Sequence, residues 1–149
     1  MTDAASLANR AAAAMYERDV AAQSLGMTID EVRPGYARLR MRVRPEMLNG
    51  HDMCHGGLIF ALADTAFAYA CNSYDRATVA SGAAIEFLAP ARAEEVLIAE
   101  AQEQVLGGRL GVYDVEVHNE QGLRVALFRG RSYALKAPVI REDETGSPS

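Results

Sequence analysis

An apolar run from Leu58 to Cys71, interrupted by one carboxylate, most constrains what this chain can fold into. The run is rich in alanine, leucine and phenylalanine and has no proline or glycine after Gly57, which favours a helix over a strand. Its residues are apolar on all faces, so we expect a buried helix rather than a surface one. A charged side chain is rarely left unpaired there, because removing it from water is costly. Asp64 is therefore the first candidate for a functional residue.

The composition limits the classes of protein to which this chain can belong. The chain has 149 residues, half of them hydrophobic, which suits one folded domain with one sizeable core. The net charge of -5 leaves no basic stripe for nucleic acid. Two cysteines, Cys54 and Cys71, make no disulfide framework, and the sequence shows neither a secretory signal nor a membrane span. We expect a soluble, cytoplasmic protein that binds neither nucleic acid nor membrane.

The remaining chain predicts an N-terminal helix and six short strands. We expect the helix over 2–20, capped by Thr2 or Asp3, and a short helical turn over 21–25. Strands are predicted over 27–33, 36–43, 78–88, 96–106, 110–118 and 123–136, with turns at proline or glycine between several of them. Alternation indicates one apolar face in several strands: Ala37, Leu39, Met41 and Val43 in one, Val112, Val115 and Val117 in another, and Val125, Leu127 and Tyr133 in the last.

This order of elements predicts an α+β hotdog fold, in which a mainly antiparallel curled sheet wraps around one long central helix. Short turns favour antiparallel pairing, and a helix that is apolar on every face needs a sheet that curls around it. We expect one domain over 1–140, with the N-terminal helix outside the sheet and a flexible polar tail over 141–149. A sheet of this size leaves the helix open on one side, so a second copy is the natural cover.

The motif at the start of the central helix resembles a known family. It reads Asn49-Gly-His-x-x-x-His55-Gly56-Gly57, with Asp64 nine residues after His55. Together with Leu62-Ala-Asp-Thr-Ala-Phe-Ala-Tyr-Ala-Cys-Asn72-Ser73 and Val125-Ala-Leu-Phe-Arg-Gly-Arg-Ser-Tyr133, it resembles the hotdog-fold acyl-CoA thioesterases of the phenylacetate-degradation (PaaI) type. The resemblance extends from about Met27 to Tyr133.

This resemblance implies hydrolysis of an acyl-CoA thioester without metal or other cofactor, coenzyme A being part of the substrate. The family's catalytic aspartate, histidine, asparagine and glycine fall on Asp64, His55, Asn49 and Gly56. A family serine or threonine that places water has no aligned counterpart in this sequence, and the nearest residues are Thr78 and Ser81. The resemblance also implies a homo-oligomer, a dimer of dimers. Residues that we expect to contact substrate or CoA are Gly57, Thr65, Ser81, Pro90, Arg92 and Arg109.

Thioester hydrolysis needs a nucleophile or base and a group that stabilises the negative charge on the carbonyl oxygen. Asp64 can attack the carbonyl to give an anhydride or activate water, and both routes remain open. The free N–H of Gly56 at the helix start can polarise the carbonyl. Gly56 and Asp64 are eight residues apart, about 12 Å of helix rise, which is too far for both to serve one carbonyl. We therefore expect each site to take Gly56 from one subunit and Asp64 from the other.

Structural roles compete with these assignments. His55 could bond the backbone near the helix start, Asn49 could be a turn residue, and Asp64 could bond helix N–H groups or a serine. His51 and His55 are spaced like a metal pair but lack a third ligand, so we expect no metal. Both cysteines fit as small buried hydrophobes. Strand-end arginines that could be merely solvated, or could meet CoA phosphates, are Arg92, Arg109 and Arg124.

The leading function is therefore an acyl-CoA thioesterase that acts on an aryl-acetyl-CoA of the phenylacetyl or hydroxyphenylacetyl type. One alternative is a hotdog hydratase or dehydratase, whose histidine and acid have a different spacing. The other is a non-catalytic CoA- or acyl-binding module, which has no need of the buried carboxylate Asp64.

Overall fold

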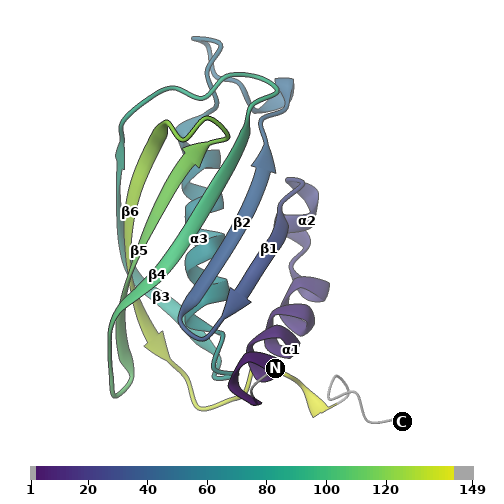
Figure 1. The fold of residues 1–149 in the computed structure, drawn as a ribbon, viewed down its shortest axis with the longest axis vertical. Coiled ribbons are helices and arrows are strands. Elements are labelled where there is room, and N and C mark those ends of the chain that lie inside the picture. Colours follow the sequence, from purple (N-terminus) through teal and green to yellow (C-terminus); the bar gives the residue numbers. More distant parts are fainter. Residues whose placement is uncertain (1–2, 143–149) are drawn as a thin grey trace.

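The structure, a computed structural model, describes residues 3–142 (Figure 1). The elements follow the predicted order of helix, two strands, buried helix and four strands. The predicted Thr2 cap and residues 143–149 of the predicted tail lie outside the described residues. The elements are α1 (Asp3–Arg18), α2 (Val20–Ser24), β1 (Thr28–Arg33), β2 (Tyr36–Arg42), a 3-10 turn (Pro45–Met47), α3 (Gly56–Cys71), β3 (Thr78–Phe87), β4 (Val96–Gly107), β5 (Leu110–Asn119) and β6 (Arg124–Ala134).

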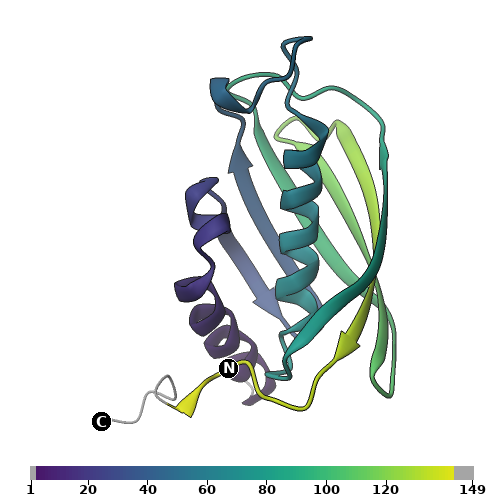
Figure 2. The same ribbon diagram turned by 180° about the vertical axis from the view of Figure 1, so that it is seen from behind.

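The six strands form one sheet in the order β1-β2-β4-β5-β6-β3, with every neighbouring pair antiparallel. The sheet curls around α3, and α1 lies beside β1 at the other side of the molecule from β3 (Figures 1 and 2). The predicted hotdog arrangement is confirmed, but α1 packs against the same core as α3 rather than on the outer face of the sheet, with the Tyr16 and Tyr69 ring centroids 6.4 Å apart. Within residues 3–142, no helix is long and apolar enough to cross a membrane.

The core lies between α3 and the inner face of the sheet. Leu62, Ala63 and Ala66 of α3 are fully buried, as are the predicted inner residues of β2. Strand β6 comes close to α3 at Gly130, where an added Cβ would lie 2.8 Å from the Phe67 ring. Glycine at this position therefore lets the strand pass over the aromatic side chain.

Two strand faces differ from the prediction. Tyr113, Val115 and Val117 point into the core, whereas Val112 lies on the outer face with the acidic residues of β5. Tyr113 can be buried because its hydroxyl donates a 3.0 Å hydrogen bond to Glu103. In β6 the inner residues include Val125, as predicted, together with Ala126, Phe128 and Ser132, and the predicted Leu127 and Tyr133 are exposed on the outer face.

One side of α3 remains open. Gly57 is exposed, and Phe60, Ala61, Asp64 and Ala68 are only partly buried, at the spacing of a single helix face. Next to this side, β3 forms the edge of the sheet, and most of its residues are exposed. The predicted incomplete cover of the helix is confirmed, and it coincides with a free strand edge.

Candidate active site

His55 caps the start of α3. Its Nδ1 accepts a 3.4 Å hydrogen bond from the Gly57 N–H, and its backbone carbonyl accepts from Leu58 and Ile59. The Gly56 N–H, in contrast, makes no hydrogen bond with any residue in 3–142. It is a free donor at the positive end of the helix dipole, where a developing negative charge is stabilised.

Gly56 opens onto a cleft of about 340 Å³. Asn49 and Pro90 also line this cleft, so the fold brings together three of the predicted site residues. The ring of Phe87, at the end of β3, covers Gly56: an added Cβ would lie 3.0 Å from it. Glycine thus allows close approach to the amide here, but the nearest group in the chain is an aromatic ring that the sequence did not point to.

Asn49 holds the loop that leads into α3. Its Oδ1 accepts hydrogen bonds from the N–H groups of His51 and Met53, at 2.9 and 3.2 Å. The turn role that the sequence left open for Asn49 is therefore present. Its Nδ2 group has no hydrogen bond within the described chain, and so it can still donate to a ligand in the cleft.

Asp64 lines a second, larger hollow of about 770 Å³. Its carboxylate makes no hydrogen bond or ion pair with any residue between 3 and 142, so neither structural role considered for it is present. Burial raises the pKa of Asp64, because the charged form loses solvation without gaining a partner. Cys71 lines the same hollow, and burial raises the pKa of its thiol to about 12, as expected for an inert hydrophobe.

Most of the hydroxyl groups near Asp64 already donate hydrogen bonds within the chain. Thr65 Oγ1 donates to Ala61 O at 2.6 Å, along its own helix. Ser81 lies exposed at a bulge in β3, and its hydroxyl donates to the Arg131 carbonyl at 3.3 Å. Of the two residues considered for placing water, Thr78 lines the hollow of Asp64 and Ser81 does not.

Arg92 and Arg109 lie at opposite ends of β4. The backbone N–H of Arg92 donates to the Glu95 carboxylate at 2.6 Å, and the Arg109 guanidinium donates to the Ala134 carbonyl at 3.0 Å. A strand of this length spans about 40 Å. A single chain therefore does not gather both arginines around one CoA phosphate group.

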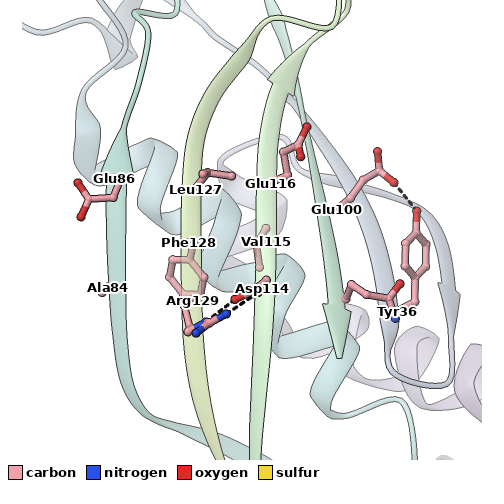
Figure 3. Close-up of a pocket in the computed structure, with 11 residues that line it drawn as sticks. Tyr36, Ala84, Glu86, Glu100, Asp114, Val115, Glu116, Leu127, Phe128 and Arg129 are labelled. Carbon is pink, nitrogen blue, oxygen red and sulfur yellow. Dashed lines mark hydrogen bonds and ion pairs between the residues drawn. The ribbon is translucent and has the colours of Figure 1, made fainter. Parts of the chain in front are cut away.

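A groove of about 570 Å³ crosses the outer face of the sheet, on the side away from α3 (Figure 3). Most of its charged groups are paired: Arg129 donates to both oxygens of Asp114 at 2.6 and 2.8 Å, the Tyr36 hydroxyl donates to Glu100 at 2.7 Å, and Glu116 pairs with Arg124. These contacts hold the pKa values of Asp114 and Glu100 below their usual range. Carboxylates stabilised in this way are poor bases, in contrast to Asp64.

Sequence reasoning missed one part of the hollow of Asp64. Met15 and Arg18 of α1 line it, as does the C-terminal segment 137–142. No local pattern could have indicated this, because α1 and the segment lie at opposite ends of the chain. Among the described residues, no group of three His, Cys, Asp or Glu side chains could hold a metal ion.

Comparison with known proteins identifies a family and close relatives. Residues 51–126 match the model of the thioesterase superfamily. The acyl-coenzyme A thioesterase PaaI of Escherichia coli (strain K12) is 50% identical over 129 residues, 87% of this chain and 92% of that protein. The structure of the E. coli PaaI protein from the phenylacetic acid degradation operon has a TM-score of 0.89 and 48% identity, covering 90% and 97% of the two chains. A mutant of the phenylacetic acid degradation protein PaaI from Thermus thermophilus has a TM-score of 0.74 and 37% identity, covering 76% and 97%.

Proposed function

The chain belongs to the thioesterase superfamily, and from this premise we propose that it hydrolyses an acyl-CoA thioester to the free acid and CoA. The acyl group that we propose is aryl-acetyl, of the phenylacetyl or hydroxyphenylacetyl type, in line with the names of its PaaI relatives. The observation that carries the proposal is Asp64, a partly buried carboxylate that has no hydrogen-bond or ion-pair partner among residues 3–142 and faces a hollow. The reaction needs no metal or other cofactor.

Asp64 acts on the thioester carbonyl carbon. It either takes a proton from water as the water attacks, or attacks directly to form an anhydride that water then hydrolyses. The C–S bond breaks, and the sulfur leaves as the CoA thiolate, which takes up a proton. The raised pKa of Asp64 makes it a stronger base than an exposed aspartate. The Gly56 N–H donates to the carbonyl oxygen as its charge grows, and Asn49 and His55 hold the loop that presents this amide.

These two groups do not meet within one chain. Gly56 and Asp64 line different hollows, and the helix between them accounts for about 12 Å. Each site therefore combines Asp64 of one chain with the partner subunit's Gly56. The open side of α3 and the free edge of β3 support such a dimer, because a second copy would cover both.

The two α3 helices then run antiparallel across a two-fold axis, and the position of the axis follows from the pairing. If residue 56 of one chain faces residue 64 of the other, the residue midway between them, Phe60, faces the same residue of the other chain. Phe60 and the adjacent Ala61 are on the open side of α3. Assembly of two such dimers into a tetramer is proposed from the family resemblance alone.

A thiol-release assay with phenylacetyl-CoA tests the function. We expect release of CoA from the wild-type chain, unaffected by dialysis against a chelator. The matched control is Asp64→Asn, which keeps the shape of the side chain without its basicity. Hydration of an enoyl-CoA without thiol release would indicate that the protein is a hydratase. Tight binding of CoA without turnover would indicate a non-catalytic binding module.

Mixed dimers test the shared site. Asp64→Ala removes the acid, and Gly56→Pro removes the amide N–H at a helix position that tolerates proline. The new ring atoms approach Phe87, which is 54% exposed and has room to shift. In a mixed dimer one site carries both defects and the other carries none, so we expect up to about half of the wild-type rate. Verified mixed dimers without activity would contradict this placement of the site.

A cross-link tests the axis. Ala61→Cys should form a disulfide between subunits on mild oxidation, because residue 61 lies beside the proposed midpoint. Ala68→Cys, on the same face of α3, is the matched control. It is displaced from its own copy by about 24 Å along the helices and should stay reduced. Cross-linking of both variants, or of neither, would exclude this arrangement.

A further inference from the structure

The hollow of Asp64 has a wall that the catalytic chemistry does not explain. Four parts of the chain line it: α3, the start of β3, α1 and the C-terminal segment 137–142. The last two contribute charged residues, Arg18, Arg141 and Glu142, and also three apolar ones, namely Met15 from α1 and Val139 and Ile140 from the segment. We call these three residues, with their backbone, the apolar wall.

The segment is held in place by specific contacts. Arg18 donates a 3.0 Å hydrogen bond to the Val139 carbonyl, and the Ile140 N–H donates at 2.8 Å to the Asp75 carboxylate. Val139 and Ile140 are 5% and 8% exposed. They pack on Ala11 and Ala14 of α1 as a cluster separate from the main core. The segment is therefore held against α1 outside the main core, whereas Met15 packs against both clusters.

The position of the wall matters because the thioester carbonyl must lie beside Asp64. The part of the acyl group beyond the carbonyl must then enter space next to that residue. The phosphates of coenzyme A are charged, so they are not expected to lie against these three apolar residues. The acyl group does, and its binding is favoured roughly in proportion to the apolar area that it buries there.

We propose that the apolar wall formed by Met15, Val139 and Ile140 receives the acyl group and sets the largest acyl group that the enzyme accepts. This inference rests on the proposed thioesterase function and adds the specificity-determining residues. The segment 137–142 acts as the adjustable side of the pocket, because it is tied to α1 rather than built into the core.

The test compares kcat/KM for phenylacetyl-CoA with that for the longer 4-phenylbutyryl-CoA. Met15→Ala and Val139→Ala enlarge the hollow from two different elements. We expect each to raise the ratio of longer to shorter substrate about tenfold, the usual effect of one or two methylenes in an apolar pocket. The matched control is Leu127→Ala, a similar truncation in the outer groove of the sheet, which should leave the ratio unchanged.

A second measurement keeps the proposal separable from the function on which it rests. In the Asp64→Asn background, Kd for the two acyl-CoA esters and for CoA alone reports binding without turnover. The wall variants should change the ratio of the two esters' Kd values. The Kd of CoA alone should stay unchanged. An unchanged ratio in both folded wall variants would overturn the wall while leaving the hydrolase intact. Absence of thiol release from the wild-type chain would overturn the function, and the Kd ratio would still decide whether the wall binds the acyl group.

Discussion

Asp64 and Asp114 are the same residue type, and the two regions that hold them have opposite effects on the carboxylate. Asp114 lies on the outer face of the sheet, directly across from Arg129 in the β5–β6 register, and receives two hydrogen bonds from it (Figure 3). Asp64 lies in the hollow beside α3, and no residue between 3 and 142 is its partner. Consequently the pKa of Asp114 is lowered by the guanidinium, and that of Asp64 is raised by burial.

The difference shows how a fold can keep one acid structural and another reactive. A cross-strand partner stabilises the charged form of Asp114 and makes it a weak base. Ionised Asp64 lowers the free energy of unfolding because its charge is partly desolvated and not compensated by a partner among the described residues. For the same reason its carboxylate is a stronger base.

The largest expected effect comes from removing the reactive carboxylate. Asp64→Asn should lower turnover by about 10²- to 10⁴-fold or more, the usual contribution of a positioned base. The free energy of unfolding should not fall, because the variant removes a buried charge that has no partner. Thiol release and thermal melting measure the two effects. An active Asn variant would mean that Asp64 is not the catalytic group.

The next effect comes from giving Asp64 the partner that Asp114 has. Ala68 is one helical turn further along the open side of α3 and lines the same hollow. Ala68→Lys should place an ammonium near the carboxylate, lower the pKa of Asp64 and reduce kcat about tenfold or more. Ala68→Met, of similar length but uncharged, is the control. If both variants lose the same activity, bulk rather than charge is responsible.

The pH dependence of stability should have opposite signs in the two regions. The raised pKa of Asp64 means that its cost is absent below the unfolded value near 3.9 and grows as pH rises through the folded value. The lowered pKa of Asp114 means that its stabilisation is present above the unfolded value and is lost as pH falls through the folded one. Relative to wild type, the Tm of Asp64→Asn should therefore rise with pH, and that of Asp114→Asn should fall. Parallel curves would contradict the assignment.

The smallest effect is expected on the outer face. Arg129→Met breaks the pair with Asp114 but keeps much of the side-chain length. Because both groups are partly exposed, the Tm should change by only a few degrees, and kcat/KM should not change. A loss of activity comparable to that of Ala68→Lys would show that the outer groove takes part in the reaction.

The features visible in the sequence were local ones. Periodicity predicted the helices and strands, and the single acid in an apolar run indicated Asp64. Grouping the valines of β5 by residue type misplaced Val112 and Tyr113, whereas strict alternation puts Tyr113 on the inner face with Val115 and Val117; the Tyr113 hydroxyl can be accommodated there because it donates to Glu103. The ring of Phe87 over Gly56, and the lining of one hollow by both Val139 and Asp64, bring together distant segments. Such contacts depend on tertiary packing, which no residue pattern within one segment can reveal.

The pairing of β3 with β6 has a consequence for synthesis of the chain. Strand β3 leaves the ribosome well before β6, the last strand and its neighbour in the sheet. Until then, the nascent chain carries the apolar helix α3 with only part of its cover, a state that favours aggregation or chaperone binding. The residues of β6 thus complete the sheet, and α3 gains the full cover of its own sheet only after β6 has been synthesised.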